Sequence, residues 1–256
     1  MKQSLFKVVS NRRLTADVFE LRLEGDASDF KSPGQFAEIS IPGLYLRRPI
    51  SVCDWTSDSL VLLVKEVGAG TKALGTLPPG ATLDMITGLG NGFDPSPAIH
   101  GPSATSAVLV GGGIGIAPLY ALARVIAEAR ARRGQKSALS VVLGFRSAAD
   151  AFYVDEFTKL GCRALVATED GSLGMCGFVT DVLSTLPGPS FAYACGPMPM
   201  LRALARHSIV SDGQFSLEAR RGCGFGACMG CTIATACGPK RICRDGPVFP
   251  MGDVQW

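Results

Sequence analysis

The chain has 256 residues and includes nine cysteines. This length is sufficient for two ordinary domains whose cores need no disulfides, and an odd number of cysteines does not suit a disulfide framework, so we expect a reducing, cytoplasmic location. The formal net charge is only +3 and no run of Lys and Arg exceeds two residues, which argues against nucleic acid or an anionic membrane as a partner. The first residues interrupt every apolar run with a charged or polar residue, so we expect no export signal.

The first part of the chain, from about residue 4 to residue 98, carries short segments of alternating polarity separated by Gly, Pro and Asp turns. The clearest segments are Val18–Leu23, Phe36–Ile41 and Leu60–Val67. Such dense period-2 patterning, with hardly any helical spacing, predicts a small antiparallel β-barrel. The proline-rich stretch Asp94–Pro102 follows, and we predict that it is a linker.

Two short motifs in this region have the composition of a flavin site. Arg48-Pro-Ile-Ser51 offers a planar guanidinium that can grip two pyrophosphate oxygens, and a serine that can hydrogen-bond the edge of an isoalloxazine ring. The backbone amides and the hydroxyl of Gly68-Ala-Gly70-Thr71 are able to close around the same phosphates. The alternative is that both motifs are ordinary turns, one solvated and one between a strand and a helix.

From Ala107 onward the pattern changes to alternating strands and helices. We predict strands at 107–110, 139–143, 163–167 and 191–194, and helices that begin near Leu119 and at about 152–160, 179–186 and 199–207. This order is typical of a doubly wound parallel α/β sheet that binds nucleotides. The long uncharged stretch from Gly101 to Ala123 has the length of a membrane span, but the glycines and Pro118 in it favour a buried strand, a turn and a helix start.

Two motifs in this second region predict a dinucleotide site. Gly111-Gly-Gly113-Ile-Gly115-Ile-Ala-Pro118 has a proline where the fingerprint has its third glycine, yet it lies between a predicted strand and helix. There a phosphate can approach the backbone, and the helix N-terminus supplies N–H groups. The segment that begins at Cys195 ends the last predicted strand, at the edge where open α/β sheets bind ligands. The alternative is that both segments serve packing alone.

The most specific pattern lies near the C-terminus, where four cysteines follow the spacing Cys-x4-Cys-x2-Cys-x11-Cys among several glycines. They are Cys223, Cys228, Cys231 and Cys243. The spacing matches the plant-type pattern of a [2Fe-2S] cluster. A structural zinc site is the alternative, because Cys228-x2-Cys231 is also a zinc half-site. Cys237 lies between the last two and competes for the place of the fourth ligand.

Taken in order, these motifs and the cysteine tail resemble the ferredoxin reductase superfamily, and within it the electron-transfer subunits of class 1B dihydroorotate dehydrogenase. Further similar stretches are Gly88–Phe93, Glu169–Gly174, Gly177–Asp181 and Leu217–Cys231. The resemblance covers nearly the whole chain. It implies an FAD barrel, an NAD-binding domain and a [2Fe-2S] tail. It also implies a separate FMN-containing subunit that oxidises dihydroorotate in pyrimidine biosynthesis, with two copies of each subunit in a heterotetramer.

The resemblance also implies a set of contact residues, with the flavin on the aliphatic Ile50 where many reductases have an aromatic residue, and with Cys243 as the fourth cluster ligand. The implied FAD contacts are Arg48, Pro49, Ile50, Ser51, Val64, Lys65, Glu66, Gly70 and Thr71. The predicted NAD contacts are Gly111, Gly112, Gly113, Gly115, Pro118, Cys195, Gly196, Pro197 and Met198. No acid or base catalyst is expected, and His100 and His207 are interpreted as surface or satisfied histidines.

We therefore predict three parts: an FAD-binding barrel at 1–100, an NAD-binding α/β domain at 101–210 and a cluster segment at 211–256. Two other functions stay open, the small subunit of an NAD(P)H:ferredoxin oxidoreductase or sulfide dehydrogenase, and a redox-sensing or zinc-stabilised binding protein. NAD and NADP are not distinguished, because Arg146 is suited to a 2′-phosphate. The remaining thiols, Cys53, Cys162 and Cys176, are interpreted as small buried residues or unpaired thiols.

Overall fold

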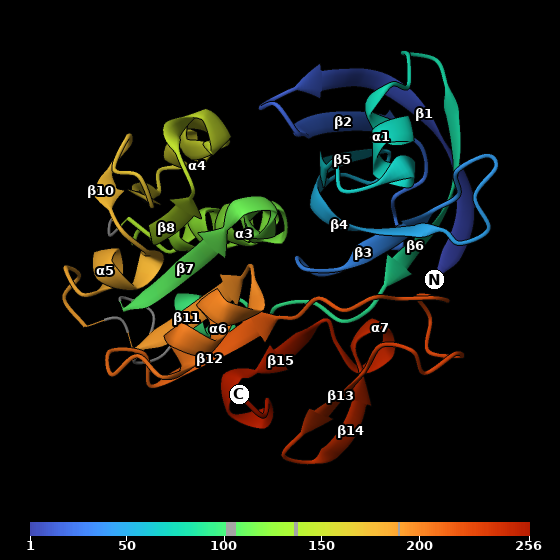
Figure 1. Cartoon of the computed structure of the whole chain (residues 1–256). Coiled ribbons are helices and arrows are strands. Elements are labelled where there is room, and N and C mark those ends of the chain that lie inside the picture. The colour runs from blue at the N-terminus through green and yellow to red at the C-terminus, as the bar shows by residue number, and fades with distance from the viewer. Residues whose placement is uncertain (101–105, 136–137, 189) are drawn as a thin grey trace. The chain divides into compact units, whose positions relative to one another are not determined.

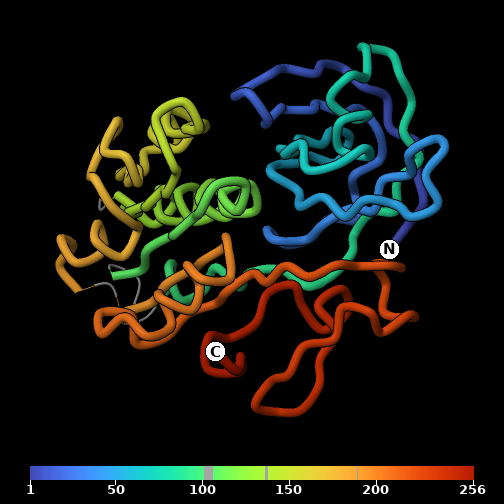
Figure 2. The backbone as a smooth tube through the Cα atoms, viewed as in Figure 1, coloured from blue at the N-terminus to red at the C-terminus, as the bar shows by residue number. Residues whose placement is uncertain are grey.

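The computed structural model describes residues 1–100, 106–135, 138–188 and 190–256. These residues form two compact units (Figure 1). Unit 1 contains Met1–Gly92 together with Glu218–Val248, and unit 2 contains Phe93–Leu217 together with Phe249–Trp256. Figure 2 follows the chain from the blue and cyan barrel, through the green to orange sheet, to the red C-terminal segment. Most of the predicted cluster segment thus groups with the N-terminal barrel, although the whole nucleotide-type region separates them in sequence.

Unit 1 is built on a closed barrel of six antiparallel strands in the order β1-β2-β5-β4-β3-β6. The strands are β1 (Lys2–Arg13), β2 (Val18–Glu24), β3 (Phe36–Ile39), β4 (Arg48–Trp55), β5 (Ser59–Lys65) and β6 (Thr82–Leu89). Alternate side chains such as Phe6, Phe19 and Leu62 fill the interior, as the period-2 pattern requires. The short helix α1 (Ala69–Gly75) follows β5, and its Leu74 is buried in the same core.

The cysteine-rich part of unit 1 is short and contains little regular structure. It forms the hairpin β13 (Thr232–Thr235) and β14 (Gly238–Arg241), followed at once by the one-turn helix α7 (Ile242–Asp245). The loop before the hairpin carries positive φ angles at Gly224, Gly226 and Met229. A chain that turns this tightly exposes several backbone N–H groups on its inner side, which suits a loop that surrounds an inorganic cluster.

Unit 2 is organised around a seven-stranded sheet in the order β10-β9-β8-β7-β11-β12-β15, with parallel pairing from β10 to β12. Its strands are β7 (Ala107–Gly112), β8 (Ser140–Phe145), β9 (Arg163–Thr168), β10 (Met175–Cys176), β11 (Phe191–Cys195), β12 (Asp212–Ser216) and β15 (Val248–Pro250). Its helices are α2 (Ser96–Ile99), α3 (Ala117–Arg132), α4 (Val154–Lys159), α5 (Val179–Leu183) and α6 (Met198–Ala205). Short 3-10 turns in the described part of unit 2 are Gly113–Ile116, Ala148–Asp150 and Met251–Asp253.

The first strand of this sheet, β7, lies between β8 on one side and β11 on the other. The order of the strands therefore reverses between β7 and β11, and in open α/β sheets such a switch point is where ligands bind. The predicted barrel and the predicted doubly wound sheet are both confirmed. The stretch considered as a membrane span forms β7, a turn and the start of α3, apart from residues 101–105, which lie outside the described residues. No helix in the described part of the chain is long and apolar enough to cross a membrane.

Candidate functional site

The two flavin-type motifs of unit 1 lie together. Arg48 begins β4 and Gly70 lies in the first turn of α1, and a Cβ atom placed on Gly70 would stand 2.6 Å from Arg48 Nε. The Arg48 side chain therefore passes directly over the glycine, where a larger residue would displace it. This places a guanidinium beside the backbone N–H groups of a tight turn, and both are donors of the kind that bind a pyrophosphate.

The side chain of Thr71 closes that turn. Its Oγ1 accepts the backbone N–H groups of Val67 at 2.9 Å and of Gly68 at 3.2 Å. The two preceding charged side chains are engaged elsewhere, because Lys65 pairs with Asp17 at 3.3 Å and Glu66 pairs with Arg13 at 2.6 Å. Thr71 thus shapes the loop, while Lys65 and Glu66 offer their backbone more readily than their side chains.

The remaining flavin-motif residues divide between the two faces of the barrel wall. Ile50 and Val64 belong to the barrel core, so their side chains face inward. Ser51 lies directly across from Phe36 and Pro49 directly across from Glu38 on β3, and directly opposed residues share one face of a sheet. Because Phe36 and Glu38 are outside the barrel core, Pro49 and Ser51 share the outer face with them.

The two NAD-type motifs of unit 2 are also brought together. Gly111 on β7 pairs in register with Cys195 on β11. A Cβ on Gly112 would stand 2.6 Å from Met200 Sδ, and a Cβ on Gly115 would collide with the carbonyl of Cys195. The two loops therefore pack against each other at the switch point. Close packing against the facing loop is therefore sufficient to explain why positions 112 and 115 are glycine, and no ligand is needed to explain them.

Gly113 is different from its neighbours. Its φ is +52°, and a Cβ at this position would meet nothing within 4 Å. The backbone is therefore open on this side, just before α3, whose second residue is Pro118. An open glycine turn that leads into a helix N-terminus is a site where a phosphate can reach backbone N–H groups. On the facing loop, Pro197 is the N-cap of α6 and Met198 begins it, 38% exposed.

The four predicted cluster cysteines stand in two pairs. The Sγ atoms of Cys231 and Cys243 are 3.2 Å apart and both residues are buried. Cys223 Sγ accepts the backbone N–H groups of Ala227 at 3.2 Å and of Cys228 at 3.4 Å, and the Cys228 thiol also contacts it. Among the described residues, no group of three or more Cys, His, Asp and Glu side chains is placed to hold one metal ion. Two thiol pairs fit a cluster with two irons, each of which takes two thiolates.

The surroundings of Cys223 and Cys243 shift the pKa values of the two thiols in opposite directions. Burial raises the pKa of Cys243 to about 12, and contact with Cys231 adds to the effect. For Cys223 burial acts in the same direction, but the N–H groups that point at its sulfur outweigh it and lower its pKa to about 6. Backbone donors aimed at a sulfur stabilise the thiolate, which is the form that binds iron.

The other cysteines lie apart from this arrangement, and the structure contains no disulfide among its nine cysteines. Cys237 is exposed at the turn of the β13–β14 hairpin, the end opposite the one that joins Cys231 and α7. Cys53 and Cys162 are buried, and burial raises the pKa of Cys162 to about 11. Cys176 is exposed on β10, so it is not the small buried residue that was one of its two interpretations. His207 bonds Ser184 at 3.3 Å.

Two charged residues near the cysteine loop were not predicted as site residues. Glu38 on β3 is 1% exposed, and Arg221 lies two residues before Cys223 with its guanidinium 4.1 Å from the centre of the Phe36 ring. Arg221 opens the cysteine motif in the sequence, which is the one signal that could have pointed to it. Glu38 gives no such signal, because an acidic residue in an alternating strand is usually solvated.

Comparison with known proteins gives two matching family models. Residues 218–255 match the iron-sulfur cluster binding domain of dihydroorotate dehydrogenase B, and residues 109–206 match the oxidoreductase NAD-binding domain. Relatives extend the match to the whole chain. The electron transfer subunit of dihydroorotate dehydrogenase B (NAD(+)) from Listeria monocytogenes serotype 4a is 39% identical and covers 99% of each chain. The subunit of the same name from Bacillus caldolyticus is 40% identical over 96% of each chain.

Solved structures with the same fold include that of an NADH-dependent reduced ferredoxin-NADP oxidoreductase. It is 30% identical, with a TM-score of 0.83, and the match covers 98% of this chain and 90% of that one. A flavohemoglobin from Malassezia yamatoensis with bound FAD and heme is 20% identical, with a TM-score of 0.66 over 81% of this chain and 56% of that one. The second likeness shows the fold alone.

The barrel, the doubly wound sheet and the cysteine loop together define a flavin- and nicotinamide-dependent reductase of the ferredoxin reductase superfamily. Within that class, the full-length relatives show that the chain belongs to the family of electron transfer subunits of dihydroorotate dehydrogenase B. It is therefore an oxidoreductase subunit that works with a catalytic subunit, and its cofactors are FAD, an iron–sulfur cluster and NAD. The predicted fold, family and cofactors are confirmed, while the individual contact residues stay predictions.

Proposed function

We propose that this chain passes electrons from the FMN of a dihydroorotate dehydrogenase catalytic subunit, through a [2Fe-2S] cluster and FAD, to NAD+ in pyrimidine biosynthesis. The observation that carries the proposal is the match to such subunits over 99% of the chain, which includes both nucleotide-type motifs and the cysteine tail. When bound, the cluster carries single electrons and the flavin converts them to the electron pair that a nicotinamide takes.

The residues of this chain bind and orient these groups. Arg48, Gly70 and the turn closed by Thr71 bind the pyrophosphate of FAD, and the outward-facing Ser51 bonds the flavin edge. The open turn at Gly113 and the N-terminus of α3 bind the phosphates of NAD. The four thiols would hold the cluster, in the two pairs Cys223 with Cys228 and Cys231 with Cys243. The close approach of Arg48 to Gly70 and the two thiol pairs support these assignments.

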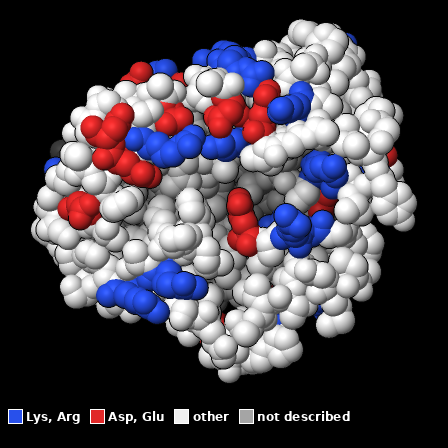
Figure 3. Space-filling model, viewed as in Figure 1, with Lys and Arg blue, Asp and Glu red and all other residues white. Residues whose placement is uncertain are grey.

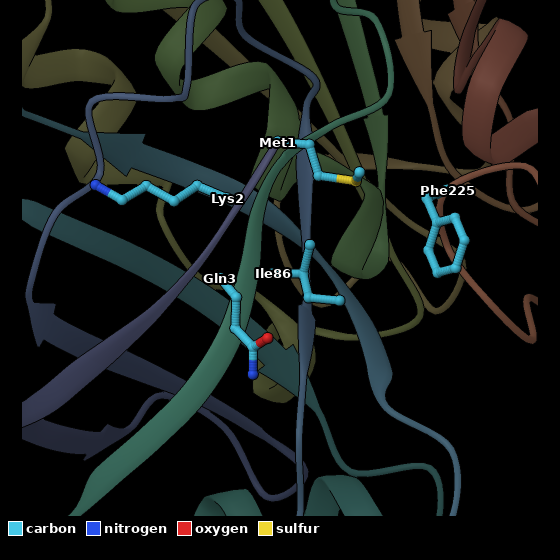
Figure 4. A pocket seen from close by; sticks show the side chains of 5 residues that line it. All are labelled: Met1, Lys2, Gln3, Ile86 and Phe225. Atoms are coloured by element: carbon cyan, nitrogen blue, oxygen red, sulfur yellow. The ribbon is translucent and has the colours of Figure 1, made fainter.

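The partner surface is assigned to the cysteine loop. A hollow of about 230 Å³ lies beside the loop, lined by Met1, Lys2, Gln3, Ile86 and Phe225 (Figure 4). Met1, which immediately precedes β1, and Ile86 on the paired strand β6 extend toward Phe225, and Phe225 is 47% exposed. Exposed apolar side chains around a hollow are typical of a surface that meets another protein. We assign this surface to the FMN-containing subunit, in a cytoplasmic assembly of two copies of each chain.

The choice between NAD and NADP involves Arg146, which follows β8. Arg146 Nη2 lies 3.6 Å from Asp150 Oδ1, and Ser147 also donates to Asp150. A guanidinium paired with a neighbouring carboxylate is less available to a 2′-phosphate. This pairing supports NAD as the acceptor, in agreement with the name of the relatives.

The test uses the full-length protein loaded with FAD and cluster, together with the copurified catalytic subunit. Cys228→Ser should bleach the visible absorbance of the cluster and abolish dihydroorotate-driven NAD+ reduction, while NADH still reduces an artificial dye through FAD. Cys237→Ser, at the other exposed cysteine of this segment, should leave the absorbance and both activities unchanged. If Cys228→Ser retained dihydroorotate-driven activity, the cluster would not be on the electron path. If the loaded wild-type chain reduced no dye with NADH, the whole assignment would be wrong.

A further inference from the structure

The most unusual charged group in unit 1 is the carboxylate of Glu38. The side chain is 1% exposed, and neither Oε1 nor Oε2 has a hydrogen-bond partner among the described residues. Burying a carboxylate without hydrogen bonds is costly, and most buried polar groups in proteins are satisfied. A residue kept in this state requires a reason beyond packing.

The residues around Glu38 show which parts of unit 1 its carboxylate lies between. Glu38 lies directly across from Pro49 of the flavin motif, on the outer face of the barrel. A Cβ atom on Gly224 would collide with the Glu38 side chain, and Gly224 is the residue after Cys223. The carboxylate thus lies between the flavin-type motif on β4 and the cysteine loop, which covers it and excludes water.

Arg221 carries a positive charge and lies beside the same outer face of β3 as Glu38. Its Nε is buried without a hydrogen-bond partner among the described residues, and its guanidinium stacks on Phe36, two residues before Glu38 on the same face of β3. The guanidinium is within electrostatic reach of Glu218, Glu38, Cys231 and Cys243. Glu38 in turn is within reach of Cys223 and of the guanidinium groups of Arg221, Arg47 and Arg48. Cys231 and Cys243 therefore have the Arg221 charge beside them, whereas Cys223 has the Glu38 charge beside it, and the two charges differ in sign.

We propose that Glu38 and Arg221 are positioning residues that set the reduction potential of the cluster, with Glu38 lowering the potential and Arg221 raising it. This inference rests on the proposed cluster ligands. A cluster held by four thiolates gains one negative charge when it is reduced. A fixed negative charge nearby disfavours that gain and a fixed positive charge favours it, and both effects are strong where water is excluded. Charge and burial around the sulfurs are established means of tuning such centres.

The test is a redox titration of the full-length chain loaded with FAD and cluster, followed by EPR of the reduced cluster. Burial raises the pKa of Glu38 to about 7, with Arg221 opposing and Cys223 adding to the shift, so about pH 8.5 keeps the carboxylate charged. Glu38→Gln retains the shape and removes the charge. It should favour the reduced cluster about tenfold, which for one electron is about 59 mV upward. Arg221→Met should shift the potential downward, and Arg221→Lys should restore most of the loss.

The matched control is Glu20→Gln. Glu20 is another buried carboxylate of the same barrel, but it lies on β2, opposite β3 in the closed strand order, and it pairs with Arg12 and Arg22. This variant should lower the thermal midpoint and leave the cluster potential unchanged. An unchanged potential in Glu38→Gln, or shifts of the same sign in Glu38→Gln and Arg221→Met, would overturn the inference. If the wild-type chain assembled no cluster, the proposed ligand set would fail instead, so the two failures are distinguishable.

Discussion

At the scale of single residues, Asn91 holds the backbone that follows Cys243. Its Nδ2 donates to the carbonyl oxygen of Val248 at 2.8 Å and to that of Asp245 at 3.3 Å, and its Oδ1 accepts the N–H of Val248 at 3.0 Å. Cys243 lies in α7 immediately before this segment. Since this one side chain bonds three backbone groups within five residues after Cys243, it helps to hold the segment that carries the fourth predicted cluster ligand.

Asn91→Ala should therefore loosen the cluster without touching a cluster ligand. The substitution removes three hydrogen bonds, each worth about 1 kcal/mol, so the free energy of unfolding should fall by about 2–3 kcal/mol. We expect the visible absorbance of the cluster to decay several times faster in the presence of an iron chelator. The decay rate and the thermal midpoint are measured on the same preparation.

A second asparagine of the barrel provides the control. Asn11 donates to the carbonyl oxygens of Leu74 and Leu77 at 3.0 and 3.2 Å, beside α1 and away from the cysteine loop. Asn11→Ala should lower the thermal midpoint by a comparable amount but leave the rate of cluster loss close to that of wild type. If both variants lost the cluster equally fast, general destabilisation would explain the effect and Asn91 would have no specific role.

At the scale of elements, the local sequence pattern was sufficient to predict several strands of both units, although it did not single out β1 or β6. The predicted segments 18–23 and 60–67 correspond to β2 and β5, and 163–167 and 191–194 correspond to β9 and β11. The pattern was insufficient for β4, because it begins with Arg48 and Pro49 and carries the predicted flavin motif as well as core residues. The predicted linker contains α2, and its residues 101 and 102 lie outside the described residues.

Contacts between elements that are distant in sequence were harder to predict from the local sequence pattern. Glu38 alternates with the core residues Ala37 and Ile39, which predicts a solvated side chain, yet it is buried because the cysteine loop covers the outer face of β3. The local sequence pattern of β3 does not predict that a distant loop covers its outer face. The four cysteines themselves, by contrast, were predicted from the cluster spacing and the family resemblance, whereas the contact of Cys231 with Cys243 is visible only in the structure, where the hairpin brings their segments together.

The loop between β7 and α3 provides a prediction at this scale, because two of its glycines serve different purposes. Gly115→Ala would force a methyl group into the carbonyl of Cys195 and push the loop away from β11. Overpacking of this kind costs about 1–3 kcal/mol, so thermal stability and NADH binding should both decrease. Gly113→Ala meets open space at a φ of +52°, so backbone strain of about 1–2 kcal/mol is its main structural cost.

If Gly113 faces the phosphates of NAD, Gly113→Ala should raise the KM for NADH at least severalfold while cluster and flavin absorbance stay normal. Steady-state NADH–dye kinetics and circular dichroism measure the two effects separately. A KM equal to that of wild type in Gly113→Ala would show that the loop serves packing alone and that the phosphates bind elsewhere.

At the scale of the whole molecule, the charges and the apolar side chains indicate different kinds of surface. On the face shown in Figure 3, basic and acidic side chains are interspersed and do not form one continuous basic field. The hollow beside the cysteine loop is lined mainly by apolar atoms of Met1, Ile86 and Phe225. A partner recognised there would depend on apolar burial more than on long-range attraction, so its binding should weaken little as salt rises.

Phe225→Ser tests this surface directly. Phe225 is 47% exposed on the loop between Cys223 and Cys228, and truncation of a central aromatic contact typically costs about 2 kcal/mol or more, so the Kd for the catalytic subunit should rise at least tenfold. The matched control is Phe178→Ser, since Phe178 is 62% exposed in unit 2 and lies outside the hollow. Binding measured between purified subunits at low and high salt should separate the two variants. Equal Kd values would place the partner elsewhere, whereas a selective loss in Phe225→Ser would locate the electron entry beside the cysteine loop.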